Sequence, residues 1–498
     1  MTKKALVALD QGTTSSRAIV FDLQGNMLAM CNEEFPQIYP QPGWVEHDPK
    51  QILRTQISSL QRAVRRSGLH PEEIAAIGIT NQRETTLLWR RDTGECVHNA
   101  IVWQCRRTAG EVDALKARGL SDEIQKRTGL IPDAYFSGTK LRWLLQNCHL
   151  QEQAASGALC FGTIDSFLAW HLVSGHPHVI DATNASRTML FNLREQRWDE
   201  KLLEMLEIPE ACLPTVVDSS GVIGTLDPEI LGVPIPVAAM AGDQHASLFG
   251  QACFHPGDVK NTHGTGCFML MNTGSQPADK TGGLLSTMAW RTGGKPQFAT
   301  EGSVFIGGAV IQWLRDELQL IRSASESEAV AATVPDTGGV YLVPACTGLG
   351  APWWDMYSRG LLIGLTRGTG RAHIVRAALE SIAFQSADLL ETMAEDCGFK
   401  PTELKVDGGA SANSLLMQFE ADIMGIPVVR PQVMETTALG AAFLAGMGVG
   451  IYASPEETAQ FWKRDLTFEP KMPDAERRER LQQWHKAVER SRKWAEET

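Results

Sequence analysis

The amino-acid sequence predicts an α/β protein of two related domains with a ligand cleft between them. At 498 residues the chain is too long for one compact domain, and two or three are expected. Apolar runs of strand length alternate with segments of helical periodicity, which is typical of α/β layers. Two apolar hairpins with a Gly-Thr turn, one near Gly12 and one near Gly264, each open one half of the chain.

Several predicted strands stop at a cluster of polar residues. Three of them are Ile74–Thr80 before Arg83 and Glu84, Ala100–Val102 before Trp103, and Pro236–Gly242 before Asp243. Ligands of α/β sheets usually lie beyond the carboxyl ends of the strands. Polar residues in this position after several strands therefore indicate a binding site.

Helices are expected between these strands. The Asp48-Pro49 pair is typical of a helix start, with Asp as the N-cap and Pro at the first helical position. Lys140–Leu145 and Ile311–Leu320 have helical periodicity. The charged tail 474–498 carries an apolar stripe and is predicted to be a surface helix. We place the domain boundary in the loop before the second hairpin, which gives domains of residues 1–252 and 253–498.

The composition excludes several functional classes. A net charge of −12 argues against nucleic-acid binding, which needs a basic surface. The ten cysteines show no Cys-x-x-Cys spacing, which favours a reducing compartment over a disulfide framework or a zinc site. No run reaches the ~18 apolar residues that span a bilayer, and Asp10 ends the first apolar run too early for a signal peptide. We expect a cytoplasmic protein without membrane insertion.

Residues 10–17, Asp-Gln-Gly-Thr-Thr-Ser-Ser-Arg, have the composition of a phosphate-binding turn. Gly12 permits a tight turn whose backbone N–H groups can surround an anion. The hydroxyls of residues 13–16 add neutral donors, and Arg17 adds a bidentate donor. Asp10 is explained if Mg²⁺ lies between its carboxylate and the phosphate. The turn alone leaves open the alternative of a solvated hairpin tip.

No P-loop motif and no protein-kinase signature is present in the sequence, so a nucleotide site must use another backbone cradle. A second candidate is Val406–Asn413, where a strand meets two glycines and a helix is predicted to begin near Asn413. A Gly-Gly turn is common, so this segment by itself is weak evidence for a nucleotide.

Asp243 is the best candidate for a general base. It follows a predicted buried strand and precedes a helix, where a carboxylate can point into a cleft. A hydroxyl that attacks a γ-phosphoryl group needs an aligned acceptor for its proton. An N-cap role for Asp243 is the alternative, and both roles can coexist.

Arg83 and Glu84 form a donor and acceptor pair that suits adjacent hydroxyls of a polyol if both are buried. Trp103, Tyr135 and Phe268 can line a carbon backbone. For each aromatic residue taken alone, simple packing in the core is the favoured interpretation.

These motifs together resemble the FGGY family of carbohydrate kinases, and within it the members that phosphorylate glycerol. The matching segments include DQGTTSSR (10–17), GITNQRETT (78–86), AIVWQCRRT (100–108), YFSGTK (135–140), TNASRTMLFN (183–192), AGDQ (241–244), NTHGTGCFMLMNTG (261–274) and VDGGASANSLLMQF (406–419). The resemblance runs in order from about residue 4 to about residue 450. It implies two actin-like, ribonuclease H-like domains with a nucleotide cleft between them, and ATP-dependent, Mg²⁺-dependent phosphorylation of glycerol to sn-glycerol 3-phosphate.

The resemblance also implies roles for individual residues. Those expected to hydrogen-bond the glycerol hydroxyls are Arg83, Glu84, Tyr135, Asp243 and Gln244, while Trp103 and Phe268 lie against its carbons. Asp243 is expected to act as the general base, and Asp10 and Asp243 to face Mg²⁺. Those expected to contact the terminal phosphates of ATP are Thr13, Thr14, Ser15 and Arg17. Those expected to hold the rest of the nucleotide are Thr265, Gly308, Gln312, Gly409 and Asn413.

Two alternatives remain at this point. One is another kinase of the same family that acts on xylulose, ribulose or gluconate, and the Arg83-Glu84 pair with Trp103 argues against it. The other is an actin-like assembly ATPase, which needs no small polar pocket. The expected partners are glycerol and ATP, without nucleic acid, and we expect a homo-oligomer, either a dimer or a tetramer.

Overall fold

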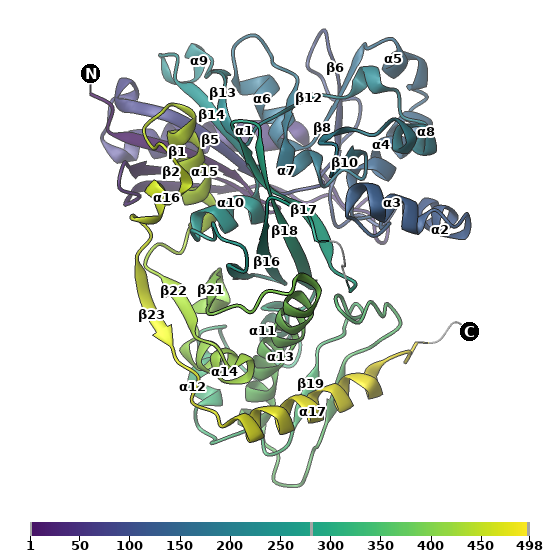
Figure 1. The fold of residues 1–498 in the computed structure, drawn as a ribbon, viewed down its shortest axis with the longest axis vertical. Coiled ribbons are helices and arrows are strands. Elements are labelled where there is room, and N and C mark those ends of the chain that lie inside the picture. Colours follow the sequence, from purple (N-terminus) through teal and green to yellow (C-terminus); the bar gives the residue numbers. More distant parts are fainter. Residues whose placement is uncertain (1, 279–281, 496–498) are drawn as a thin grey trace.

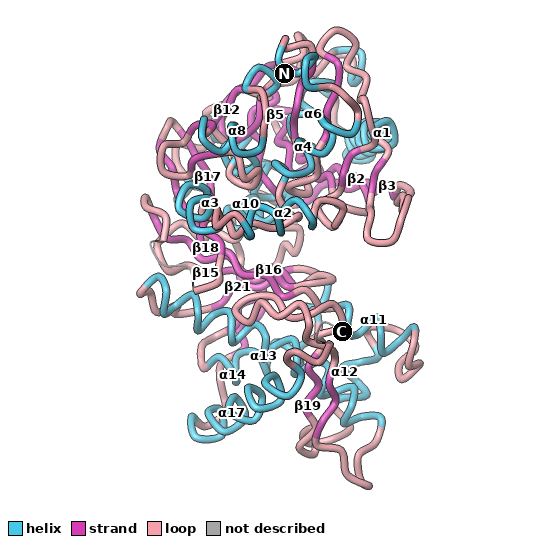
Figure 2. The backbone as a smooth tube through the Cα atoms, turned by 90° about the vertical axis from the view of Figure 1, so that its right-hand side faces the viewer, coloured by secondary structure: helices cyan, strands magenta, loops and turns pink. Residues whose placement is uncertain are grey.

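The computed structural model describes residues 2–278 and 282–495, which form two α/β halves (Figure 1). Within these residues thirteen strands form one continuous sheet, in the order β23-β22-β21-β15-β16-β18-β17-β13-β14-β5-β1-β2-β3. Helices α13, α14 and α17 gather in the C-terminal half, and α1 lies beside β2 and β3 in the N-terminal half (Figure 2). None of the described helices is long and apolar enough to cross a membrane.

The N-terminal part of the sheet combines a meander with parallel strands. Its strands are β1 (Ala5–Gln11), β2 (Ser15–Asp22), β3 (Met27–Glu34), β5 (Ile74–Asn81), β13 (Ser220–Thr225) and β14 (Pro236–Gly242). Strand β1 pairs antiparallel with β2 and parallel with β5, which pairs parallel with β14. Every residue of β5 is buried, as expected for a parallel strand covered on both faces.

The C-terminal part repeats this arrangement, which confirms the predicted second hairpin. Its strands are β15 (Val259–His263), β16 (Cys267–Gly274), β17 (Leu285–Thr292), β18 (Lys295–Val304), β21 (Leu404–Asp407), β22 (Val428–Pro431) and β23 (Arg464–Phe468). Strand β15 pairs antiparallel with β16 and parallel with β21, as β1 does with β2 and β5. The two halves therefore begin with the same hairpin and the same parallel neighbour.

Short strands pair outside the main sheet. The pairs are β4 (Glu46–His47) with β7 (Ala100–Ile101), β6 (Leu87–Arg90) with β8 (Leu159–Gly162), β9 (Val179–Asp181) with β12 (Thr215–Val217), β10 (Phe191–Asn192) with β11 (Arg197–Trp198), and β19 (Tyr341–Val343) with β20 (Leu361–Ile363). The first four pairs belong to the N-terminal half.

The helices of the N-terminal half lie mostly between β5 and β14 in the sequence. They are α1 (Pro49–Ser67), α2 (Ala109–Ala117), α3 (Ser121–Thr128), α4 (Ser137–Asn147), α5 (Gln151–Ala155), α6 (Ile164–Leu172), α7 (Ala182–Ala185), α8 (Glu200–Leu206), α9 (Pro228–Leu231) and α10 (Asp243–Gly250). The Asp48 side chain accepts the Lys50 N–H at 2.9 Å, which confirms the predicted start of α1. Helix α4 contains the predicted segment Lys140–Leu145.

The later helices are α11 (Ala309–Asp316), α12 (Glu326–Ala331), α13 (Arg371–Cys397), α14 (Ser414–Met424), α15 (Thr436–Gly448), α16 (Pro455–Ala459) and α17 (Asp474–Ser491). The predicted helix Ile311–Leu320 was wrong at its end, because Gln319 has a left-handed backbone (φ 53°) and α11 stops before it. The predicted tail helix 474–498 is confirmed as α17 up to Ser491, and residues 496–498 of that prediction lie outside the described residues. The buried Trp484 of α17 stacks on Phe384 with ring centroids 5.2 Å apart. The Trp484 indole N–H also donates to Asp388 at 2.8 Å.

Helix α15 crosses from the C-terminal half to the N-terminal sheet. It packs on β1, β5 and β14, and Figure 1 shows it in yellow-green beside these purple and teal strands. It also crosses α10 with almost no side chains between the two backbones. A Cβ atom on Gly440 would lie 1.9 Å from the Ala246 carbonyl oxygen, and one on Gly250 would lie 2.0 Å from the Thr436 carbonyl oxygen. Only glycine permits this approach.

We expect Gly440→Ala to destabilise the fold. The added methyl group would push α10 and α15 apart, and overpacking of this kind costs about 1–3 kcal/mol of unfolding free energy. Gly110→Ala in α2 is the matched control, because nothing lies within 4 Å of its added Cβ. Urea unfolding followed by circular dichroism measures both; equal midpoints for Gly440→Ala and wild type would contradict the predicted contact.

Candidate active site

The parallel pairing of β1, β5 and β14 brings the predicted catalytic residues to one edge of the sheet. Asp10 pairs with Thr80, so β1 and β5 end at the same level. Gly242 pairs with Asn81, which places Asp243 at the same edge at the start of α10. The Gln82 N–H donates to the Gln11 carbonyl at 2.7 Å and fixes the segment that leads into Arg83.

The first turn joins β1 to β2 and contains Thr13, Thr14 and Ser15. The Gly12 N–H donates to the Ser15 carbonyl at 2.9 Å, which closes the turn. Burial raises the pKa of Asp10 to about 6, although Arg17 lowers it, and the carboxylates of Asp243 and Glu435 raise it further. A divalent cation would balance this excess of negative charge. Asp10 and Asp243 are the two residues predicted to face Mg²⁺.

The described residues contain no group of three or more His, Cys, Asp or Glu side chains arranged to hold a metal ion. Mg²⁺ characteristically takes one or two carboxylates and completes its shell with water and phosphate oxygens. A pair such as Asp10 and Asp243 therefore fits Mg²⁺ that arrives with a nucleotide, and does not fit a metal held by protein alone.

Arg17 has a partner that sequence reasoning missed. Its guanidinium pairs with Glu435, the residue that precedes α15, and lies 3.9 Å from Asp10. The predicted contact between Arg17 and a phosphate stays a prediction. In this structure Arg17 instead links the first turn to the C-terminal part of the chain.

Three aromatic residues cluster beside the first turn, where they would line the predicted substrate pocket. The ring centroid of Trp103 lies 5.5 Å from that of Tyr135 and 6.5 Å from that of Phe268, with edge-to-face geometry in both pairs. The Trp103 indole N–H donates to the Thr13 hydroxyl at 3.0 Å. The aromatic wall and the predicted phosphate turn are thus directly joined.

The polar side of this pocket carries the predicted hydroxyl-binding residues. Arg83 Nε lies 3.1 Å from Asp243 Oδ1, and the Arg83 side chain is only 2% exposed. Glu84 is buried and has a left-handed backbone (φ 58°), a costly conformation that concentrates at functional sites. Gln244 Oε1 accepts from Lys260 Nζ at 2.5 Å. Burial lowers the pKa of Lys260 to about 8, although Asp407 and Asp243 raise it.

Sequence reasoning singled out none of four charged residues around this pocket. They are Arg187, Lys260, Glu301 and Glu435. Arg187 lies within the quoted motif TNASRTMLFN and Lys260 within the second hairpin, where both have the appearance of ordinary charged positions. Their role becomes visible only when the fold places them against Glu84 and Gln244.

The predicted nucleotide residues of the C-terminal half lie at the ends of neighbouring strands. The Thr265 carbonyl accepts the N–H groups of Gly307 at 2.9 Å and Ala309 at 3.1 Å, which brings the start of α11, with Gly308 and Gln312, to the second hairpin. Gly409 and Asn413 follow β21, the parallel neighbour of β15.

Asn413 has a structural role as well, since its Oδ1 accepts the Leu416 N–H at 3.0 Å and caps α14. Gly408 has a φ of 85°, and a Cβ atom there would lie 2.6 Å from the His263 carbonyl oxygen. Backbone therefore packs directly against backbone where the second hairpin meets the turn after β21.

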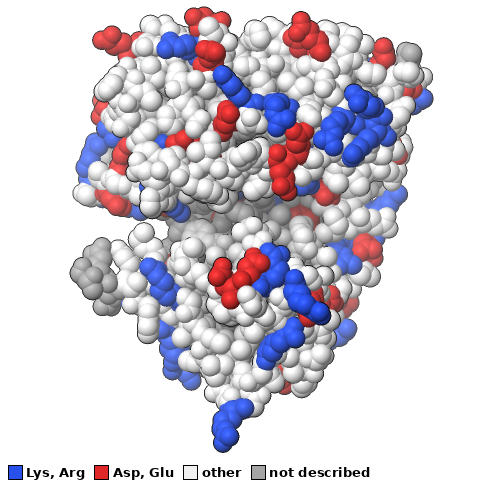
Figure 3. Space-filling model, turned by 180° about the vertical axis from the view of Figure 1, so that it is seen from behind, with Lys and Arg blue, Asp and Glu red and all other residues white. Residues whose placement is uncertain are grey.

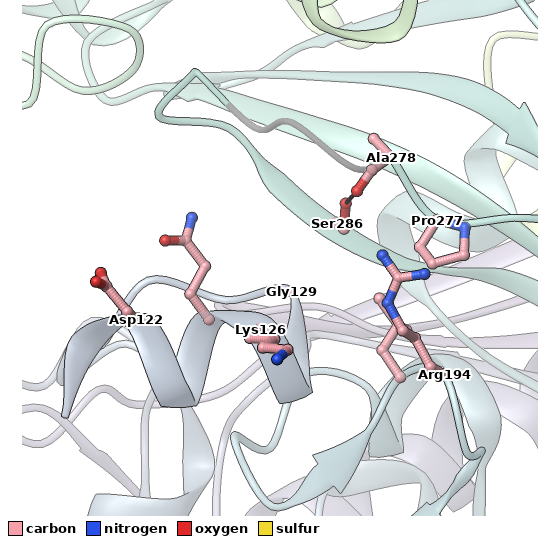
Figure 4. Close-up of a pocket in the computed structure, with 9 residues that line it drawn as sticks. Asp122, Lys126, Gly129, Arg194, Pro277, Ala278 and Ser286 are labelled. Atoms are coloured by element: carbon pink, nitrogen blue, oxygen red, sulfur yellow. Dashed lines mark hydrogen bonds between the residues drawn. The ribbon is translucent and has the colours of Figure 1, made fainter.

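The surface of the molecule is hollowed between its two halves, as the space-filling view from behind shows (Figure 3). A separate cavity of about 280 Å³ lies between α3 and the strand β17 (Figure 4). Asp122, Lys126, Arg194 and Ser286 are among its lining residues, and it contains none of the predicted site residues.

The chain matches known proteins along nearly its whole length. The N-terminal domain of the FGGY family of carbohydrate kinases matches residues 5–250, and the C-terminal domain of that family matches residues 259–449. A glycerol kinase of Caldanaerobacter subterraneus subsp. tengcongensis is 59% identical over 99% of this chain and 100% of its own. Glycerol kinase 2 of Thermotoga maritima is 57% identical over 99% of each chain.

Solved structures agree with the fold. The crystal structure of Plasmodium falciparum glycerol kinase with ADP superposes with a TM-score of 0.92, at 34% identity and over 98% of each chain. A xylulose kinase of Lactobacillus acidophilus, at 24% identity, shares the fold with a TM-score of 0.86. The predicted two-domain α/β fold is confirmed, and this chain belongs to the FGGY family of carbohydrate kinases.

Proposed function

We propose that this protein is a glycerol kinase, which transfers the γ-phosphoryl group of ATP to a terminal hydroxyl of glycerol and forms sn-glycerol 3-phosphate. The observation that carries the proposal is the contact of Arg83 with Asp243 at 3.1 Å, at the sheet edge where the Trp103 indole N–H donates to Thr13 of the first turn. Full-length relatives named glycerol kinase, at 57–59% identity, support the same substrate.

Glycerol has three hydroxyl groups on a three-carbon chain, and the pocket offers matching chemistry. Arg83 and Gln244 supply hydrogen-bond donors, and Glu84 and Asp243 supply acceptors. Trp103, Tyr135 and Phe268 surround the carbon chain with apolar surface. Pockets that bind small ligands combine an apolar wall with a few placed polar groups in this way.

Asp243 acts as the general base. Its carboxylate accepts the proton of the terminal hydroxyl while that oxygen forms a bond to the γ-phosphorus, and the bond from the γ-phosphorus to the bridging oxygen of ADP breaks. Thr13, Thr14 and Ser15 orient the terminal phosphates from the first turn, together with Arg17 once Glu435 releases it. Thr265, Gly308, Gln312, Gly409 and Asn413 bind the rest of the nucleotide.

Asp10 and Asp243 would hold Mg²⁺, which would neutralise and orient the phosphate oxygens. The protein side chains supply positioning and charge compensation, which account for most of the catalysis of phosphoryl transfer. Because water must be kept from the γ-phosphoryl group, we also propose that the two halves close on the substrates.

The domain organisation, oligomeric state and cellular location of the enzyme are also proposed. We propose domains of residues 1–252 and 253–498, a homo-oligomer of two or four chains, and a cytoplasmic location. All ten cysteines of the chain are free thiols in this structure, which suits a reducing compartment.

We expect ADP release by the purified protein to depend on glycerol. A coupled assay with MgATP measures it, with xylulose and gluconate as the competing acceptors of this family. The relatives at 57–59% identity are named glycerol kinases, so glycerol should give the highest kcat/KM. A higher kcat/KM for xylulose or gluconate would mean that this acceptor, and not glycerol, is the substrate. ATP turnover that none of the three acceptors stimulates would indicate an assembly ATPase.

We expect Asp243→Asn to lower kcat for glycerol about 100- to 10,000-fold, because the attacking hydroxyl loses its proton acceptor. Affinity for glycerol should fall only modestly, since the amide still hydrogen-bonds a hydroxyl. Asp227→Asn is the control, because Asp227 only caps the short helix α9. Initial rates over a range of glycerol concentrations separate the two effects, and near-normal kcat would rule out Asp243 as the base.

A further inference from the structure

Four buried charged residues form a closed ring behind the glycerol pocket. Arg83 donates to Glu301 through Nη1 at 2.5 Å and through Nη2 at 3.2 Å. Arg187 donates to Glu301 through Nη2 at 3.0 Å and to Glu84 through Nε at 2.6 Å. Because Arg83 and Glu84 are neighbours in the chain, their backbone closes the ring. We call Arg83, Glu84, Arg187 and Glu301 the charged ring.

The ring is electrically balanced and shielded from water. Its two guanidinium groups and two carboxylates cancel in formal charge, and all four residues are at most 3% exposed. Charges so deeply buried remain stable only where each is paired, so the loss of one member leaves another uncompensated. The side chains of the ring therefore hold one another in a single arrangement.

Two members of the ring, Arg83 and Glu84, are residues predicted to bind glycerol, and the other two are not. Arg83 reaches Asp243 on its pocket side, while its Nη atoms are occupied by Glu301 behind it. Arg187 and Glu301 are 0% exposed, and their side chains form ion pairs with Arg83 and Glu84. Their ion pairs act on Arg83 and Glu84, and the Arg187 guanidinium also lies 5.7 Å from the centre of the Tyr135 ring.

The backbone at Glu84 also depends on outside support. Its left-handed conformation (φ 58°) is costly for a residue with a side chain and persists only where the surroundings fix it. The Glu84 carbonyl accepts from the hydroxyls of Thr86 at 3.0 Å and Ser137 at 3.1 Å. Arg187 fixes the other end of the residue, because its Nε binds the Glu84 carboxylate.

The ring spans both domains of the family. Arg83, Glu84 and Arg187 lie within the N-terminal match, residues 5–250, whereas Glu301 lies on β18 within the C-terminal match, residues 259–449. The glycerol pocket is therefore oriented in part by a strand of the opposite domain.

We propose that Arg187 and Glu301 are positioning residues for the acceptor, which set the affinity for glycerol by holding Arg83 and Glu84 in place. This inference rests on the proposed function, because it takes Arg83 and Glu84 as the groups that bind glycerol. Neither Arg187 nor Glu301 is proposed to contact ATP.

The experiment compares steady-state KM for glycerol and for ATP in three variants. Arg187→Lys keeps the positive charge. The single ammonium group of lysine cannot reproduce the planar guanidinium, which donates to both Glu84 and Glu301. Glu301→Gln keeps the shape and removes the charge. Arg187→Met/Glu301→Met removes one charge of each sign, so the core stays balanced and the chain is expected to fold even if a single variant does not.

We expect each variant to raise the KM for glycerol on the order of 10- to 100-fold, because a small misplacement of the binding groups is enough. The KM for ATP should stay within about twofold of the wild-type value, because the lost interaction supports the binding of glycerol and not of ATP. Arg291→Met is the matched control. It removes another paired guanidinium, 2.6 Å from Asp218, on the neighbouring strand β17, and should change neither KM.

Thermal unfolding and calorimetric binding of ADP identify the variants that are folded. A folded variant with the wild-type KM for glycerol would overturn the inference, and so would equal rises in KM for glycerol and ATP, which indicate a general structural effect. Failure of the proposed function has a different signature, since the wild-type protein itself would then show no glycerol-dependent release of ADP.

Discussion

The parallel alignment of β1, β5 and β14 is the constraint on which the rest of the site depends. Because the three strands end at one level, Asp10, the Arg83 segment and Asp243 meet there although they are far apart in the sequence. The first turn then adds Thr13, which binds Trp103 of the aromatic wall. Backbone pairing of the strands thus gathers the residues proposed to bind a metal, phosphate and a polyol, and one side-chain hydrogen bond adds the aromatic wall.

Much of this site could be predicted because its residues follow strands or turns directly. Asp10, Arg83, Glu84, Trp103 and Asp243 all stand where an apolar run stops, and the edge of an α/β sheet is where ligands bind. The second hairpin could be predicted from its likeness to the first. Local patterns of this kind carry information about neighbours in the chain and about strand ends.

The supporting charges could not be predicted in the same way. Arg83 meets Glu301 across 218 residues and Glu84 meets Arg187 across 103, and no local pattern records such contacts. The partner of Arg17 is Glu435, at the start of a helix that lies in the predicted C-terminal domain but packs on the N-terminal sheet. Helix α15 is apolar on almost every side, so its sequence indicates burial but not where it is buried.

The position of α15 has a consequence for the order in which this protein is made. The apolar face of β1, β5 and β14 is covered by residues 436–448, which leave the ribosome long after the strands they cover. Domains usually fold as units during synthesis, the N-terminal one first. Here the first half emerges with one face of its sheet bare, and that face stays open to chaperones, and to other nascent chains, until the C-terminal half has been translated.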